Sequence, residues 1–188
     1  MFEIIKGHDG GACFWIQPVK VHSQKCFGWD AVEECPEEEI SLDEEDVFTF
    51  LRYFFEKHFD PSLVYNRERK DDIHGSGGTM DASFEWYLTH NFYNYESANK
   101  MIADIETYAN ELERTELDCV PEEYLKYYLI AFNESTNISN WDQNTDALKP
   151  AATANLPLVA DYCRKVAQSI QTMMERKPDW PLISIMGP

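Results

Sequence analysis

The sequence predicts an α+β domain, with an antiparallel or mixed sheet of about four to six strands and three to four helices packed mainly on one face. Two neighbouring segments carry this prediction. In residues 80–90, apolar Phe84, Trp86 and Leu88 alternate with more polar residues, which is typical of a strand with one buried face. From Ser97 the period changes to that of a helix, and its apolar stripe comprises Met101, Ile105, Tyr108 and Leu112. Because the strand has polar residues on its second side, we expect at least one strand of the sheet to have a solvent-exposed face.

The N-terminal segments are predicted to form a β-hairpin. Residues 1–5 and 13–21 are apolar enough for two strands, and the loop between them is rich in glycine. Pro18 has no N–H to donate, so it indicates an edge position or a bulge in the second strand.

A helix is predicted next, from a capping box at Ser41 and Glu44 to about His58. Asp60 and Pro61 end it. A short strand is expected at 63–65, followed by turns over 66–78.

The second half of the chain is predicted to be mostly helical. A turn is expected at 91–95, between the strand at 80–90 and the helix that begins at Ser97. Another helix begins at Pro121, and a long polar loop covers 133–155. Asn155 is expected to cap a helix that runs to about Lys177, and the apolar residues 182–186 form a last buried strand. No repeat or domain boundary is apparent, so residues 1–188 are expected to form one domain.

Charge is the most unusual property of the composition. Thirty-four acidic residues against sixteen basic ones give a net charge of −18. Binding to nucleic acid or to an anionic membrane surface is therefore disfavoured, whereas a basic partner is favoured. Five cysteines with no CxxC pair indicate free thiols, and the N-terminus has no signal-peptide pattern, so we expect a cytoplasmic protein.

The acidic segment, residues 30–46, is the strongest local signal. It contains ten acidic residues and no basic one. We consider three interpretations: a docking surface for a basic partner, a solvated loop ahead of a helix, or, with less support from the spacing, a metal site. The docking interpretation assigns partner contacts to Trp29, Glu33, Glu34, Glu37, Glu38 and Glu39.

No catalytic motif is present in the sequence. The glycines after His74 lack the lysine and the following helix of a phosphate-binding loop, so they indicate a hairpin turn. None of the five histidines has the spacing of a zinc site, and no cofactor is predicted. Asp71, Asp72 and His74 form a local cluster that suggests acid–base chemistry or a metal site, and His8 with Asp9 is a similar fragment.

Three functions remain open. The first is a non-enzymatic protein-binding module with an acidic surface; its size, acidity and aromatic content resemble those of small immunity proteins that neutralise basic toxin nucleases, which implies a basic partner. The second is a hydrolase, with a site near Asp71, Asp72 and His74 or one built from residues distant in sequence. The third is an assembly protein whose apolar C-terminal strand or tyrosine-rich helix lies at a homodimer interface.

Overall fold

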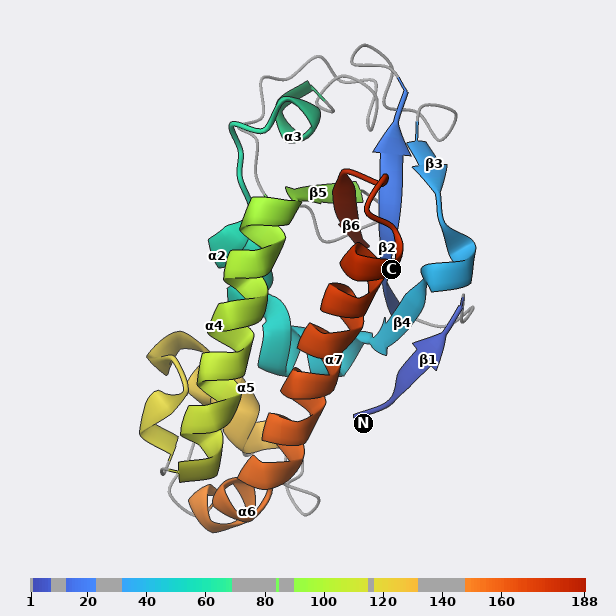
Figure 1. Cartoon of the computed structure of the whole chain (residues 1–188). Helices are drawn as coiled ribbons and strands as arrows, with labels where there is room; N and C mark the ends of the chain where they lie inside the picture. The colour runs from blue at the N-terminus through green and yellow to red at the C-terminus, as the bar shows by residue number, and fades with distance from the viewer. Residues whose placement is uncertain are drawn as a thin grey trace.

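The fold was analysed in a computed structural model, which describes residues 2–7, 13–22, 32–68, 84, 90–114, 117–131 and 148–188. Within these ranges, the side chains of residues 67, 68, 119, 123, 124, 126, 127 and 130 are not described. The chain forms an antiparallel sheet with helices packed mainly on one face, as predicted (Figure 1). No helix in the described ranges is both long and apolar enough to cross a membrane.

The sheet has six strands in the order β1–β4–β2–β6–β5, and β3 also pairs with β2. All pairs are antiparallel. The strands are β1 (Ile4–Lys6), β2 (Cys13–Val21), β3 (Val32–Glu34), β4 (Ile40–Asp43), β5 (His90–Asn94) and β6 (Leu182–Met186). The bounds of β2 and β6 confirm the sequence prediction.

The helical elements connect and cover this sheet. They are η2 (Pro36–Glu38), α1 (Glu44–Asp46), the π-helical turn η3 (Val47–Leu51), α2 (Arg52–His58), α3 (Val64–Glu68), α4 (Tyr95–Arg114), η5 (Leu117–Cys119), α5 (Glu122–Ala131), α6 (Lys149–Ala154) and α7 (Leu156–Arg176). The predicted helices at Pro121 and Asn155 are thus confirmed as α5 and α7.

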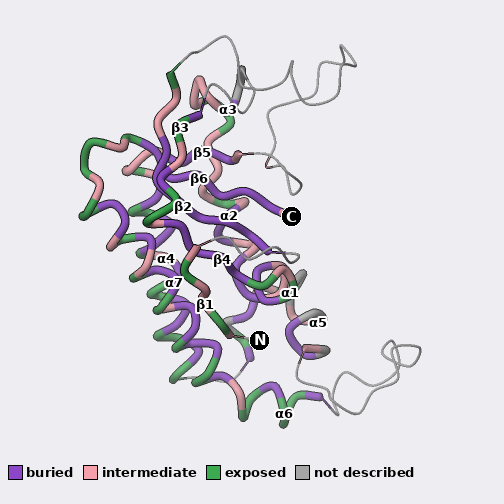
Figure 2. Tube along the Cα trace, turned by 90° about the vertical axis from the view of Figure 1, so that its right-hand side faces the viewer, coloured by how far each residue is buried: buried purple, intermediate pink, exposed green. Residues whose placement is uncertain are grey.

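The main core lies between the sheet and the two long helices. Phe14 and Ile16, two residues apart in β2, point toward this core and are fully buried. In α4 the buried stripe contains the four residues that the periodicity predicted, and α7 packs beside it. Figure 2 shows the sheet-facing sides of both helices as buried and their outer sides as exposed. The hydrophobic stripes therefore decide which way each helix faces.

The predicted N-terminal hairpin is wrong, because β4 lies between β1 and β2. Ile4 pairs with Leu42, and Leu42 pairs on its other side with Phe14. Ile40 and Leu42 alternate with polar residues and are buried, so this end of the acidic segment has a strand pattern of its own. Strand β4 thus pairs with β1 on one side and with β2 on the other, in place of the direct pairing of β1 with β2 that a hairpin would have.

Pro18 lies in a central strand, so the predicted edge position is wrong. On one side β2 pairs with β6 along 15–19, including Pro18 with Ile183. On the other side the partner changes from β4, which pairs with 13–16, to β3, which pairs with 19–21. Pro18 therefore falls in the gap between two partner strands, where a missing N–H interrupts no ladder on that side.

Three local predictions need correction. Residues 91–95 are not a turn, because most of them belong to β5, and α4 already begins at Tyr95. Residues 63–65 lead into the short helix α3 rather than forming a strand. The helix cap is Asp43 instead of Ser41, since the Asp43 carboxylate accepts hydrogen bonds from the backbone of Glu45 and Asp46.

Asn66 of α3 closes the outer edge of β5. Its side-chain amide donates to the backbone carbonyl of Phe92 (2.8 Å) and accepts from the backbone N–H of the same residue (3.0 Å). It also donates to the carbonyl of Asp60 (2.9 Å) and is fully buried. One side chain thus satisfies the N–H and C=O of Phe92, the middle residue of β5, which a further strand would otherwise use.

Candidate functional site

The acidic segment is folded into the body of the protein over its described part, 32–46. Glu33 and Glu34 belong to β3, Glu37 and Glu38 to η2, and Glu39 connects η2 to β4. Trp29 and Asp30 lie outside the described residues. A solvated loop is therefore not what these residues form, because β3 and β4 are part of the sheet.

Two of the predicted contact residues bind the end of α7. Lys177 Nζ lies 2.7 Å from Glu37 Oε1, and Arg176 lies 3.3 Å from Glu38 Oε2. The hydrogen bond from Lys177 lowers the pKa of Glu37 to about 2. These two carboxylates consequently have basic partners within their own chain, and a foreign partner would compete with them.

Other acids of the segment face inward. Glu39 is 8% exposed and Asp46 is 1% exposed. The Asp46 carboxylate accepts a hydrogen bond from the backbone N–H of Phe2, and burial raises its pKa. Glu33 stays on the surface, 2.9 Å from His22. The segment is thus divided between structural and surface carboxylates.

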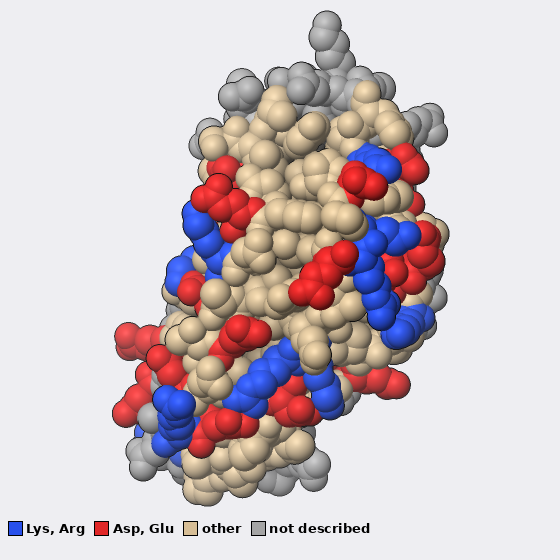
Figure 3. All heavy atoms as spheres, viewed as in Figure 1, with Lys and Arg blue, Asp and Glu red and all other residues tan. Residues whose placement is uncertain are grey.

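Most of the described basic side chains are paired with acids of the same chain. Seven lysines and arginines lie 2.5–3.3 Å from a carboxylate oxygen: Arg52, Lys57, Lys100, Arg164, Lys165, Arg176 and Lys177. Figure 3 shows the two signs interleaved over α4 and α7. The excess of negative charge must therefore come from carboxylates elsewhere.

Unpaired carboxylates gather where β1, β4 and α1 meet. Glu3 immediately precedes β1, and Asp43 is the last residue of β4, the strand that pairs with β1. Glu44 and Glu45 follow in the first turn of α1, and no described lysine or arginine pairs with either. We call Glu3, Asp43, Glu44 and Glu45 the acidic corner. Glu3, Asp43 and Glu45 are exposed and Glu44 is half-buried, and the Asp43 carboxylate also caps α1.

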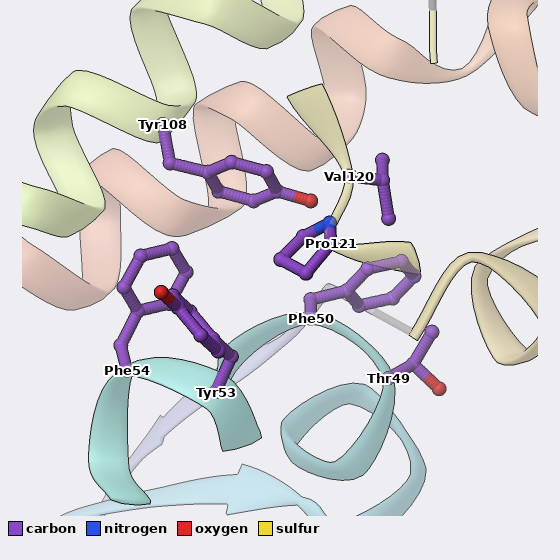
Figure 4. Close-up of a pocket in the computed structure, with 7 residues that line it drawn as sticks. All are labelled: Thr49, Phe50, Tyr53, Phe54, Tyr108, Val120 and Pro121. Carbon is purple, nitrogen blue, oxygen red and sulfur yellow. The ribbon is translucent and has the colours of Figure 1, made fainter. Parts of the chain in front are cut away.

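An aromatic pocket opens between α2, α4 and the start of α5 (Figure 4). It is lined by Thr49, Phe50, Tyr53, Phe54, Tyr108, Val120 and Pro121. Its empty volume is about 230 Å³, part of which is open solvent. The space enclosed among these residues is only about 10 Å³, room for about one water, so the pocket is too small for a cofactor or a bound side chain.

The rings of this pocket are held by one another and by an irregular helix. Phe54 lies 5.1 Å from Tyr108 and 5.3 Å from Tyr53, measured between ring centroids. Thr49 and Phe50 come from the π-helical turn η3, and such turns occur often at functional sites. Phe50, Phe54 and Tyr108 are buried, whereas Tyr53 is half-buried.

Residues distant in sequence form a polar row on the other face of the sheet. Ser184 Oγ of β6 lies 2.8 Å from His90 Nδ1 of β5, and His90 Nε2 lies 3.6 Å from Glu34 Oε1 of β3. Gln17 pairs with Ser184 across the sheet and is 2% exposed. The order hydroxyl, imidazole, carboxylate is that of a nucleophile, its base and an orienting acid. Sequence analysis missed this row, because Ser184 and His90 are 94 residues apart.

The predicted acid–base cluster cannot be placed, because Asp71, Asp72 and His74 lie outside the described residues. In the described ranges, no three histidine, cysteine or carboxylate side chains come together as a metal site. Strand β6, predicted as one possible homodimer interface, is buried and paired on both sides, so it offers no surface to a second copy.

Comparison with known proteins adds no functional information: no protein-family model, curated protein or solved structure matches this chain.

Proposed function

We propose that this protein is an acidic, non-enzymatic binding module for a basic protein partner. The observation that carries the proposal is the internal pairing of the basic side chains, which leaves the negative excess to unpaired carboxylates such as those of the acidic corner. Such a surface attracts cationic partners over long distances and repels nucleic acid. The partner contacts predicted at Trp29, Glu33, Glu34, Glu37, Glu38 and Glu39 stay predictions. Among the described acids of this set, the side chains of Glu37 and Glu33 are the most accessible, at 61% and 47% exposed.

The proposal is tested by charge reversal with a matched control. Glu44→Lys with Glu45→Lys reverses two charges of the acidic corner. Glu96→Lys with Glu106→Lys makes the same change in net charge on α4. Each protein is immobilised and exposed to a lysate of its native cell at about 50 and 300 mM salt, and bound proteins are quantified by mass spectrometry.

We expect the wild type and the α4 variant to enrich basic proteins at low salt, the corner variant to lose them, and high salt to weaken every capture. A melting curve of each variant checks the fold, because lysines in the first turn of α1 oppose the helix dipole. Equal recovery of basic proteins by both variants would contradict the role of the acidic corner. Recovery without basic enrichment or salt dependence would contradict the proposal.

A hydrolase is the second candidate function, and the polar row is the observation that favours it. In such an enzyme, Ser184 Oγ would bond to the carbonyl carbon of an ester while its proton passes to His90 Nδ1. The same proton would then go to the leaving alcohol, and water would release the acyl group. A fluorophosphonate probe tests this role, since it labels activated serines. Labelling of Ser184 that is lost in His90→Gln would support the enzyme, and an unlabelled Ser184 would exclude this nucleophile.

A further inference from the structure

Strand β1 lies at the opposite end of the sheet order from β5 and pairs only with β4 in the described part of the chain (Figure 1). Their antiparallel ladder continues to Gly7, whose N–H donates to the carbonyl of Glu39 (2.8 Å). Residues of an antiparallel pair alternate between those that exchange hydrogen bonds and those that do not. The bond at Gly7 therefore fixes the alternation along β1: Gly7 and Ile5 bond to β4, whereas Ile4 and Lys6 do not.

The backbone groups of Ile4 and Lys6 consequently face away from β4. The N–H and C=O of each residue point outward, and they have the two-residue spacing that an added strand would use. None of these four groups bonds to a described residue. Lys6 is exposed and Ile4 is half-buried. At the edge of β5, by contrast, Asn66 satisfies the corresponding groups of Phe92. Strand β1 therefore keeps the unpaired groups that another chain can use.

The acidic corner lies at one end of this edge. Ile4 pairs with Leu42, and the next residues of the two strands beyond this pair are Glu3 and Asp43. A second copy of the chain would bring its own net charge of −18 to the edge, so pairing between two copies is opposed by repulsion. An incoming strand with positive side chains would be attracted instead. Charge complementarity therefore favours a basic segment over a second copy as the occupant.

We propose that an extended basic segment of the partner adds to the sheet along β1, with its backbone bonded to Ile4 and Lys6 and a lysine or arginine beside the acidic corner. This inference rests on the proposed function and gives it a mode of binding. Strand addition takes its affinity from main-chain hydrogen bonds and its specificity from side chains. Because β1 offers only four main-chain groups, the charges select which segment binds.

The test follows the backbone amides of β1 by NMR in the ¹⁵N-labelled full chain. The probe is an acetylated and amidated peptide of the sequence Arg-Val-Arg-Val-Arg-Val, which is basic and rich in a strand-forming residue. At saturation we expect the Ile4 and Lys6 amide protons to shift downfield and to exchange at least fivefold more slowly. The Ile5 amide already bonds to β4, so its exchange should change by less than twofold.

A methylated peptide is the matched ligand control. It carries methyl groups on its two central amide nitrogens, so it keeps the charge and the side chains but loses a donor on each of its edges. We expect it to bind roughly two- to tenfold more weakly than the unmodified peptide, as for the loss of one hydrogen bond.

Two variants at one position separate the backbone from the side chain. Lys6→Pro removes an outward N–H and breaks no bond to β4, whereas Lys6→Thr loses the same charge and keeps the N–H. We expect Lys6→Pro to bind the peptide at least fivefold more weakly than Lys6→Thr, with a melting curve of each as a check of the fold. If Lys6→Pro does not fold, the amide pattern and the methylated peptide still test the inference. Glu44→Lys with Glu45→Lys should weaken binding roughly two- to fivefold at low salt and less at high salt.

Three results would overturn the inference: unchanged exchange of the Ile4 and Lys6 amides, equal binding of the two peptides, or slow exchange that depends on protein concentration without peptide, which would assign the edge to a second copy. Failure at this edge is distinguishable from failure of the proposed function. Salt-sensitive capture of basic proteins with no change at Ile4 and Lys6 means that the module binds them elsewhere. Changes at both amides without any capture of basic proteins mean that the edge binds extended cationic chains but that the proposed function is wrong.

Discussion

Replacement of Asn66 should expose how much the protein depends on one side chain at the edge of β5. Asn66→Ala removes three hydrogen bonds at 2.8–3.0 Å, two of them to Phe92. Phe92 is 2% exposed, so its N–H and C=O would lose their partners in a buried place. Each such orphaned group costs roughly 1–3 kcal/mol. Asp60 is more exposed, so water can replace its lost bond.

We therefore expect Asn66→Ala to lower the free energy of unfolding by about 3 kcal/mol. For a chain of this length that corresponds to a fall in Tm of about 6–12 °C. Asn66→Asp should lower the free energy of unfolding more than Asn66→Ala near neutral pH, because its carboxylate would face the carbonyl oxygens of Asp60 and Phe92. Lowering the pH should reduce the difference in the free energy of unfolding between the two variants, since a protonated carboxyl recovers one hydrogen-bond donor.

Urea unfolding followed by circular dichroism measures these changes, and Asn99→Asp is the control. Asn99 is exposed on α4, so the same chemical change there should alter stability by less than about 0.5 kcal/mol. Hydrogen exchange adds a local readout, since the Phe92 amide should lose protection in Asn66→Ala. If the Tm of Asn66→Ala stays within 2 °C of the wild type, the edge of β5 is satisfied in another way and the reasoning is refuted.

Three further predictions concern ionisable groups. Lys177→Met should raise the pKa of Glu37 from about 2 toward the ordinary value for glutamate, as measured by carboxyl ¹³C NMR; an unchanged pKa would mean that Lys177 is not its cause. Burial raises the pKa of Asp46, so ionisation of Asp46 opposes folding as the pH rises through that pKa. Asp46→Asn should therefore stabilise the protein at pH 7 and lose that advantage at pH 3, and equal effects at both pH values in urea unfolding would contradict this. Burial also raises the pKa of Cys163 to about 12, so at pH 8 the native protein should be alkylated there far more slowly than the unfolded chain; equal rates by peptide mass spectrometry would show that the thiol is accessible.

Long periodic segments could be predicted from the sequence, because their pattern depends only on local spacing. The stripe of α7 extends over six turns, and an error at one position does not change the result. Strand β6 is apolar at nearly every position because it is buried on both faces of the sheet. In both segments the number and spacing of the apolar residues indicate how much of the element is buried.

Short polar strands could not be predicted, because their stability comes from distant partners. Asn91 favours turns, yet in β5 it is fully buried and its amide donates to the carbonyl of Ile185, 94 residues away. Strand β4 could not be predicted for a similar reason, because acidic residues surround its apolar residues Ile40 and Leu42 in the sequence. The aromatic pocket was missed for a related reason. It depends on a π-helical turn and on contacts between four elements, and neither leaves a local signal.

The distribution of carboxylates also decides which mutations can test binding. Glu37 and Glu38 were predicted as partner contacts, but they hold the last residues of α7 through Lys177 and Arg176. Reversing them would place like charges against that helix end, so any loss of binding would be mixed with a loss of local structure. Glu44 and Glu45 have no such lysine or arginine partners in the described part of the chain. Because Glu44 and Glu45 lie in the first turn of α1, where negative charge favours the helix dipole, a binding defect in their variants reports on surface electrostatics only when the melting curve is unchanged.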